Sequence, residues 1–265
     1  MKIGVVGLGV VGSAIKTGFT ELGHDVFCHD VKLDTSLEDV LETKICYICV
    51  PTPSNEDGSC NVSIVESVVE KLSSMSYKGL LIIKSTVEPG TTDKLSEKFP
   101  NLDLGFVPEF LRERCAISDF IVHHDVCIVG VNTKEHFKLV KKSHGYYPKE
   151  FVLVSPSEAE ICKYFSNIYN ATLITFANSF YEVCSKMDIS YDNVRHAVQK
   201  RWNVSGEYLD CNKNFRGFGG VCLPKDTKAM NTFCKVNNIP VDFFDNILKE
   251  NKKYTTTVPK GMRKE

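Results

Sequence analysis

The sequence lacks three features that would assign it to common functional classes. Its 32 basic residues are balanced by 33 acidic ones, and a net charge of −1 provides no field that would recruit nucleic acid or an anionic membrane. No apolar run approaches the roughly 18 residues that a membrane-spanning helix needs. Residues 1–12 form a strand interrupted by glycines and not a cleavable signal, so we expect a cytoplasmic protein with no nucleic-acid or membrane partner.

Cysteine, by contrast, is abundant, with eleven residues scattered through apolar stretches. This is the usage of a small buried hydrophobe in a reducing compartment, so we expect no disulfides. Cys46 and Cys49 have the spacing of a CxxC motif, but they lie in an apolar run where strand residues three apart face opposite sides. We interpret them as buried strand residues and predict no metal site.

The first part of the chain has the pattern of an α/β fold. Short β-rich runs alternate with helical patterns, and the runs have the little polar alternation of strands covered on both faces. This pattern predicts a Rossmann-type, doubly wound parallel sheet over residues 1–156. The expected strands are residues 2–6, 25–29, 45–50, 79–83, 103–106, 126–131 and 151–154, and residues 63–72 and 134–142 are among the expected helices.

The second part of the chain is predicted to be mainly α-helical. Residues 157–186 contain no Gly or Pro and carry apolar residues at three- and four-residue spacing, which predicts one long helix. Further helices are expected at residues 193–199, 225–236 and 243–249. We therefore predict a helical central domain over residues 157–250. The basic tail of residues 251–265 lacks periodicity, so we expect a solvated, frayed end.

A glycine-rich segment follows the first strand. Gly7, Gly9 and Gly12 stand where three glycines permit a tight turn, close approach of a pyrophosphate and close helix packing. Asp30 ends the second expected strand, where a carboxylate can bind the ribose hydroxyls and would repel a 2′-phosphate. The pair predicts NAD as the cofactor, with nearby Lys32 as the one feature that would suit NADP.

Three further loops are expected to border the cofactor crevice. They leave strands at residues 50–53, 84–91 and 106–113, and ligands of open α/β sheets bind outside the carboxyl ends of the strands. Each loop combines turn-forming Pro or Gly with hydroxyl or charged side chains. Their joint placement favours a binding role over ordinary loop chemistry.

One cysteine has an unusual setting. Cys222 lies between a glycine turn at residues 217–220, expected to be flexible, and a helix whose first turn could start at Pro224. A cysteine thiol with a pKa of about 8.5 is only a few per cent thiolate at neutral pH, and a helix N-terminus or neighbouring Lys225 would raise that fraction. This setting predicts an activated thiol.

These segments, together with residues 158–167, resemble the UDP-glucose/GDP-mannose dehydrogenase family. The resemblance runs from Met1 to about Asn246, and five motifs occur in the family's order. It implies a four-electron oxidation of a sugar C6 alcohol to a carboxylate. Cys222 would hold the aldehyde as a thiohemiacetal and then as a thioester, which water releases.

The resemblance also implies roles for individual residues. Lys163 and Asn167, one helical turn apart, would stabilise developing oxyanions. Glu109 would act as general base for thioester hydrolysis, and Asp226 with Thr86 would position water or handle protons. The implied cofactor contacts are Gly7, Leu8, Gly9, Val10, Val11, Gly12, Asp30, Pro51, Thr52, Thr86, Glu113 and Lys225. The implied substrate contacts are Glu109, Phe110, Leu111, Arg112, Lys163, Asn167, Phe215 and Gly219.

Members of the family carry a third α/β domain that binds the nucleotide, and this sequence ends roughly one domain earlier. We expect a homodimer through the central helices, because the family dimerises there. UDP-glucose is the expected substrate, with UDP-N-acetylmannosamine and GDP-mannose left open. Two other functions also remain open: a β-hydroxyacid dehydrogenase, which needs no cysteine, and a non-catalytic NAD-binding dimer that acts with a full-length partner.

Overall fold

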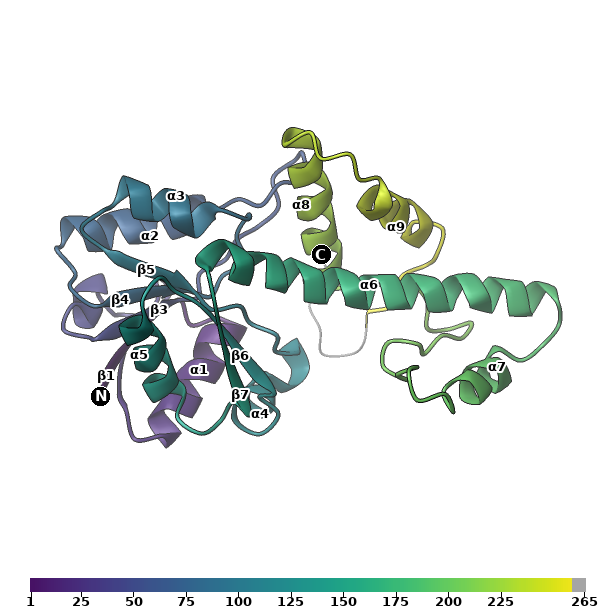
Figure 1. Ribbon diagram of the computed structural model, residues 1–265, viewed down its shortest axis with the longest axis horizontal. Coiled ribbons are helices and arrows are strands. Elements are labelled where there is room, and N and C mark those ends of the chain that lie inside the picture. The colour runs from purple at the N-terminus through teal and green to yellow at the C-terminus, as the bar shows by residue number, and fades with distance from the viewer. Residues whose placement is uncertain (259–265) are drawn as a thin grey trace. The chain divides into compact units, whose positions relative to one another are not determined.

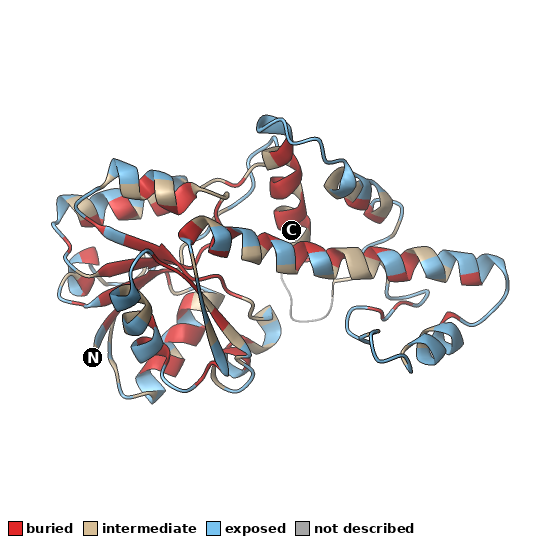
Figure 2. Ribbon diagram, viewed as in Figure 1, coloured by how far each residue is buried: buried red, intermediate tan, exposed pale blue. Residues whose placement is uncertain are grey.

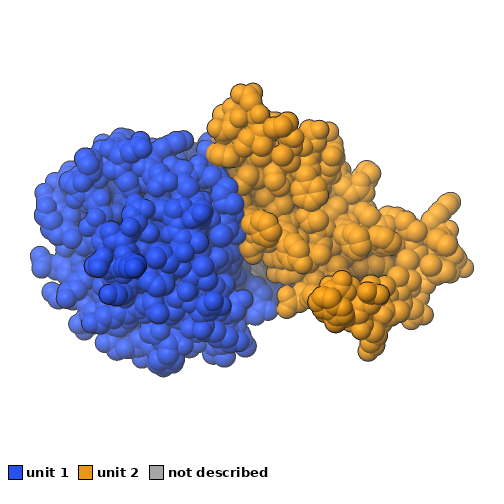
Figure 3. All heavy atoms as spheres, in the orientation of Figure 1, with its two compact units in different colours: residues 1–55, 60–163 blue, residues 56–59, 164–265 orange. Residues whose placement is uncertain are grey.

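The protein is described here from a computed structural model that covers residues 1–258. It divides into two compact units, shown in Figure 3. Unit 1 comprises residues 1–55 and 60–163, and unit 2 comprises residues 56–59 and those from 164 onward. The division falls inside the long helix α6, Pro156–Lys186. The domain boundary expected near residue 156 stays a prediction.

Unit 1 contains a seven-stranded sheet within the described residues, in the order β2-β1-β3-β4-β5-β6-β7. Every expected strand is present to within two residues at each end. The strands are β1 Lys2–Val6, β2 Asp25–His29, β3 Ile45–Ile48, β4 Leu80–Ile83, β5 Asp103–Phe106, β6 Val126–Gly130 and β7 Glu150–Val154. The Rossmann-type class is therefore confirmed.

One strand pair departs from the expected parallel arrangement. β6 runs antiparallel to β5, with Phe106 opposite Gly130, whereas the other paired strands are parallel. The connection between them contains only the short helix α4, Ala116–Ile121, preceded by the 3-10 turn η2, Glu113–Cys115. Six helical residues span about 9 Å, less than the roughly 13 Å of a four-residue strand. The connection therefore lacks the strand-length helix that usually returns the chain between parallel strands.

The core of unit 1 lies on both faces of the sheet, as the continuous apolar runs predicted (Figure 2). One face packs against α2, Ser63–Ser74, and α3, Thr91–Lys98; the other packs against α1, Val10–Glu21, α4 and α5, Lys134–His144. Because successive side chains of a strand point to opposite faces of the sheet, Ile48 packs in the first cluster and Tyr47 in the second. Cys46 is buried on β3, as expected, and burial raises the pKa of its thiol.

The strand order reverses beside β1, which pairs with β2 on one side and β3 on the other. Chains that leave neighbouring strands in opposite directions open a crevice at the carboxyl edge of the sheet. The loops after Val6 and Ile48 leave at this edge. The glycine segment at residues 7–12 therefore stands at the topological switch point, where open α/β sheets bind their ligands.

Unit 2 is helical (Figure 1). Helix α6 is followed by α7 Tyr191–Val198, α8 Cys222–Val236 and α9 Phe243–Asn251, with the side-chain oxygen of Ser190 capping α7. The sequence predicted these helices to within three residues at each end. Helix α8 begins at Cys222 itself, two residues before the expected start at Pro224. The cysteine is therefore part of the first helical turn.

The predicted tail is only partly as expected. Thr257 donates its backbone N–H to Arg216 O at 2.9 Å, and the Tyr254 ring lies 4.8 Å from the Arg216 guanidinium. Residues 252–258 thus pack against the loop before α8, because an aromatic ring and a cation stack there. Residues 259–265 of the predicted tail lie outside the described residues. Among residues 1–258, no helix is long and apolar enough to cross a membrane.

Candidate active site

The glycine turn of unit 1 has the geometry of a phosphate-binding site. Gly7 has a φ of 90°, and a Cβ on Gly12 would lie 1.8 Å from Gly7 O, so neither position accepts a side chain without strain. A Cβ on Gly9 would meet nothing within 4 Å among the described residues. The space beside Gly9 is therefore open for close approach of a ligand, while Gly7 and Gly12 build the turn.

The start of helix α1 adds hydrogen-bond donors to this turn. No side chain within the described residues caps the helix after Gly9, and Val10, Val11 and Gly12 contribute no charge. The first N–H groups of a helix have no partner inside it, and the helix dipole favours negative charge there. The turn thus fits the pyrophosphate of a dinucleotide.

Asp30 stands beside the turn as predicted. Its Oδ2 accepts from Leu8 N at 2.6 Å and its Oδ1 accepts from Lys32 N at 2.9 Å. The hydrogen bond from Leu8, and then that from Lys32, lower the pKa of the carboxyl group. Asp30 is a carboxylate at neutral pH, suited to ribose hydroxyls and repulsive to a 2′-phosphate, and these residues fit NAD.

The neighbouring loops are tied to one another. Ser85 Oγ donates to Val50 O at 2.6 Å, which joins the loop after β4 to the loop that carries Pro51 and Thr52. Thr86 is half-buried, and its carbonyl oxygen accepts from Cys60 Sγ at 3.3 Å. Thr52 and Thr86 follow the carboxyl ends of β3 and β4 in the chain. Their contacts with cofactor or water stay a prediction.

Glu109 is buried beside a partner that the sequence analysis missed. Lys84 Nζ lies 3.1 Å from Glu109 Oε2, with side chains only 2% and 10% exposed. Phe110 N donates to Glu109 Oε1 at 2.9 Å. A lysine directly after the apolar run of β4 was the available signal, because a charge that follows a buried strand needs a partner.

Lys163 belongs to the same cluster. Its Nζ donates to the carbonyl oxygen of Glu109 and lies 5.5 Å from the centroid of the Phe110 ring. The structure therefore brings together three of the predicted site residues of unit 1, on the loop after β5 and the first turns of α6.

Arg112 has a structural partner. Its Nε and a terminal guanidinium nitrogen donate to the two carboxylate oxygens of Asp119 at 3.0 and 2.6 Å, and its backbone N–H donates to the same carboxylate at 2.8 Å. These bonds lower the pKa of Asp119. The arginine fixes the loop that carries Leu111 and Glu113, both half-buried, and Asp119 is a further residue that sequence reasoning missed.

In unit 2, Cys222 is exposed at the start of α8 and is followed by a buried polar cluster. Asn167 Nδ2 donates to Asp226 Oδ2 at 2.5 Å, and Lys225 Nζ lies 2.8 Å from Asp226 Oδ1. Asp226 is 1% exposed. Three predicted site residues therefore meet one helical turn after the cysteine, and the ammonium group of Lys225 pairs with Asp226.

The glycine turn before Cys222 is held firmly, contrary to the expected flexibility. Gly217, Phe218 and Gly220 are buried, and side chains of Asn178 and Asn251 bond the backbone of Gly217 and Phe218. Phe215 is exposed and Gly219 is half-buried. The sequence carried no signal for these asparagines, because their partners lie more than 30 residues away.

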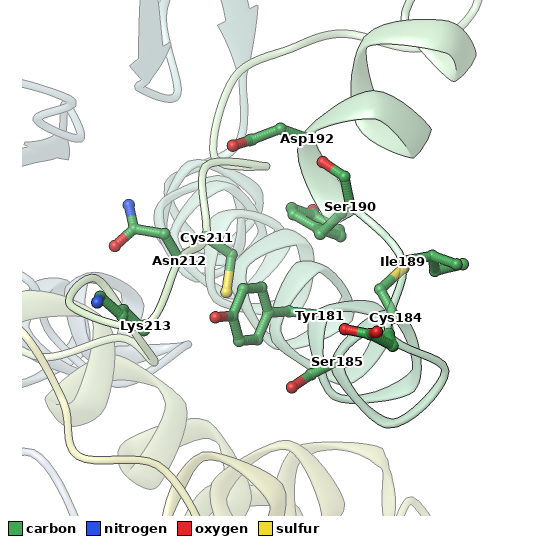
Figure 4. A pocket seen from close by; sticks show the side chains of 11 residues that line it. Tyr181, Cys184, Ser185, Ile189, Ser190, Asp192, Cys211, Asn212 and Lys213 are labelled. Carbon is green, nitrogen blue, oxygen red and sulfur yellow. The ribbon is translucent and has the colours of Figure 1, made fainter.

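A separate pocket of about 470 Å³ lies between α6, the start of α7 and the segment at residues 211–213 (Figure 4). Tyr181, Cys184, Asp192, Cys211 and Lys213 are among the residues that line it. The described lining includes none of the predicted site residues. The pocket is thus distinct from the clusters around Asp226 and Glu109.

Comparison with known proteins identifies the family. Residues 31–146 match the NAD binding domain of the UDP-glucose/GDP-mannose dehydrogenase family, and residues 157–253 match its central domain. UDP-glucose 6-dehydrogenase of Rickettsia bellii is 30% identical, over 95% of this chain and 67% of that protein. The chain thus spans about two thirds of the length of this relative.

Solved structures agree with this result. A UDP-glucose dehydrogenase from Pyrobaculum islandicum superposes with a TM-score of 0.87 at 26% identity, covering 95% of this chain and 68% of that one. A 3-hydroxyisobutyrate dehydrogenase of Mycobacterium tuberculosis shares the fold alone, with a TM-score of 0.75, 12% identity, and coverage of 95% and 92%. The chain belongs to the UDP-glucose/GDP-mannose dehydrogenase family, whose members are NAD-dependent oxidoreductases that act on a CH–OH group.

Proposed function

We propose that this chain oxidises the C6 alcohol of UDP-glucose to a carboxylate through a thioester on Cys222. The observation that carries the proposal is the exposed position of Cys222 in the first turn of α8, directly before the cluster of Asn167, Lys225 and Asp226. The choice of sugar is supported by the names of the relatives from Rickettsia bellii and Pyrobaculum islandicum.

The change from alcohol to carboxylate removes four electrons, and bound NAD supplies the hydride acceptor for each of two two-electron oxidations. Between them, the sulfur of Cys222 adds to the carbonyl carbon of the aldehyde, the C=O π bond breaks, and the thiol proton is transferred to the carbonyl oxygen. The aldehyde thus stays attached as a thiohemiacetal. Oxidation of that adduct gives a thioester, and water breaks the C–S bond to return the thiol.

Oxyanions that form on the substrate need donors. In this proposal Lys163 and Asn167 supply them, one turn apart on α6. The ammonium group of Lys163 has three N–H donors and gives one to Glu109 O; the amide of Asn167 has two and gives one to Asp226. Each therefore keeps a donor for the substrate, held in place by the other bond.

Thioester hydrolysis needs a group that takes a proton from water. We assign this role to Glu109, with Thr86 and Asp226 positioning water. Glu109 Oε2 has only Lys84 beside it among the described groups, at 3.1 Å, so it keeps an unused acceptor site. Phe110, Leu111, Arg112, Phe215 and Gly219 remain proposed substrate contacts.

NADH formation by the purified chain with NAD and UDP-glucose tests this function. We expect two NADH for each sugar consumed by wild type. Cys222→Ser cannot form the thioester and is expected to stall, with no more than about one NADH per enzyme and no sustained turnover. Full turnover by Cys222→Ser would instead favour a β-hydroxyacid-type dehydrogenase. Wild type that binds NAD but oxidises no nucleotide sugar would favour a non-catalytic NAD-binding protein. UDP-N-acetylmannosamine and GDP-mannose serve as alternative substrates in the same assay.

We further propose a homodimer formed through α6. The helix exposes apolar side chains at helical spacing: Phe165 is 72%, Phe176 55% and Phe180 46% exposed. Exposed apolar surface of this extent marks an interaction site. Sedimentation at micromolar concentration is expected to give a dimer, and Phe180→Lys a monomer with unchanged NAD affinity. A monomeric wild type would contradict the proposal.

A further inference from the structure

Two buried asparagines from different helices hydrogen-bond the backbone that leads to Cys222. Asn178 of α6 is 0% exposed, and its Oδ1 accepts from Gly217 N at 3.0 Å and from Arg216 Nε at 2.7 Å. Asn251 of α9 is 8% exposed. Its Oδ1 accepts from Phe218 N and its Nδ2 donates to Phe218 O, both at 2.8 Å. Three consecutive peptide groups, from Arg216 to Gly219, are thus bonded by side chains.

Steric constraints also restrict the conformation of this backbone segment. Gly217 has a φ of 57°, a conformation that L side chains rarely adopt, and a Cβ there would lie 2.8 Å from Asn251 Oδ1. The ring of Phe218 is buried at 2% exposure. The backbone groups of Gly217 and Phe218 are hydrogen-bonded by side chains, and the ring of Phe218 is buried. Residues 217 and 218 therefore have little freedom to move.

Asn178 is in turn held in position. Its Nδ2 donates to Ile174 O at 2.8 Å, and its Oδ1 also accepts from Cys211 Sγ at 3.4 Å. Arg216, which bonds it, stacks on Tyr181 with the guanidinium 4.6 Å from the ring centroid. A buried amide with this many partners has a single orientation, so it fixes what it bonds.

The same face of α6 makes a second hydrogen bond to the chain beyond the cysteine. Asn167 and Asn178 are eleven residues apart, about three helical turns, and therefore point the same way. Asn178 bonds Gly217, five residues before Cys222, and Asn167 bonds Asp226, four residues after it. The nucleophile is thus bracketed by two contacts with one helix.

We propose that Asn178 and Asn251 are positioning residues for Cys222: by fixing the backbone of Gly217 and Phe218, they set the start of α8 and the place of the thiol. The inference rests on the proposed role of Cys222 as nucleophile. Neither asparagine contacts the thiol in this proposal. They act on the reaction through the loop, so their loss lowers kcat more than it raises KM.

The test compares Asn178→Leu, Asn178→Asp and a control, Asn231→Leu. Leucine matches asparagine in shape but cannot accept hydrogen bonds, whereas aspartate keeps the acceptor for Gly217 N and Arg216 Nε. Asn231 is a buried asparagine on α8, 8% exposed, whose amide faces Asp245 and not the loop. Each variant is assayed for NADH formation, for NAD affinity and for alkylation of Cys222 by iodoacetamide, followed by mass spectrometry.

Asn178→Leu is expected to lower kcat about 100-fold, the effect of a 1 Å misplacement. KM for the sugar and the Kd for NAD should change less than threefold. Alkylation of Cys222 should slow by about two- to fivefold as the first turn of α8 loosens. Asn178→Asp is expected to restore most of the activity. Asn231→Leu should lower Tm but leave kcat and alkylation near their wild-type values.

The proposal is overturned if Asn178→Leu binds NAD and reacts like Asn231→Leu, or if Asn178→Asp loses as much activity as Asn178→Leu. If Asn178→Leu does not fold, Asn251→Asp decides, because it keeps the acceptor for Phe218 N but loses the donor to Phe218 O. A kcat within threefold of wild type for that variant counts against the proposal. The alkylation assay needs no sugar, so it still tests the positioning role if the proposed substrate fails.

Discussion

The glycine turn of unit 1 and the glycine turn before Cys222 contain similar residues but are held in different ways. At residues 7–12 the turn is shaped by backbone sterics, since Gly7 and Gly12 leave no room for a Cβ. At residues 217–220 the turn is held by side chains from α6 and α9. In the first turn, no side chain of the described residues caps the N–H groups that open α1, so these groups are available to a ligand. In the second turn, the N–H groups of Gly217 and Phe218 donate to asparagine side chains. A glycine cluster can therefore form a cofactor site, as at residues 7–12, or be fixed by the surrounding side chains, as in the turn before the proposed nucleophile Cys222.

The largest effect is expected where a buried charge loses its partner in unit 1. Lys84→Met would leave the carboxyl group of Glu109 buried and unpaired, which is expected to lower the free energy of unfolding by about 3–5 kcal/mol. Urea denaturation measures this. Lys84→Met combined with Glu109→Gln removes the charge and should recover most of the loss. If the single variant were as stable as wild type, the pairing of Lys84 with Glu109 would not be a source of stability in unit 1.

The cofactor turn gives the next largest effect. Gly12→Ala places a Cβ against Gly7 O and is expected to lower the free energy of unfolding by about 2–3 kcal/mol. Gly9→Ala meets no atom of the described chain, so stability should stay near that of wild type while NAD affinity falls. Thermal denaturation and NAD titration separate the two. Equal loss of stability in both variants would mean that the turn is not shaped as described.

The smallest effect concerns the loop at residues 109–113. Hydrogen bonding by Arg112 holds the pKa of Asp119 below its ordinary value, so the bond stabilises the fold above pH 4 and is lost as the pH falls through the lowered pKa. Asp119→Asn is expected to lose about 1 kcal/mol at pH 7 and less at pH 3. Stability curves from pH 7 to pH 3 measure the difference. A loss that stays constant over this range would exclude the ion pair as its source.

Much of the fold followed from periodicity. The continuous apolar runs predicted the strands and their two covered faces, and the long segment without Gly or Pro predicted α6. The direction of β6 was predicted incorrectly, because a continuous apolar run indicates that both faces of a strand are covered but does not fix the direction of each strand pair. The tail at residues 252–258 was also predicted incorrectly, since stacking of Tyr254 on Arg216 joins residues far apart in the chain.

For the candidate site, the sequence by itself determined which residues are proposed to carry the chemistry: the glycine turn with Asp30, and Cys222 with its neighbours. These depend on local sterics, helix ends and motif spacing, which act over a few residues. Only the tertiary structure decided what holds them. Lys84 pairs with Glu109 across 25 positions and Asn178 bonds Gly217 across 39, because folding removes these groups from water and each buried polar atom then needs a partner.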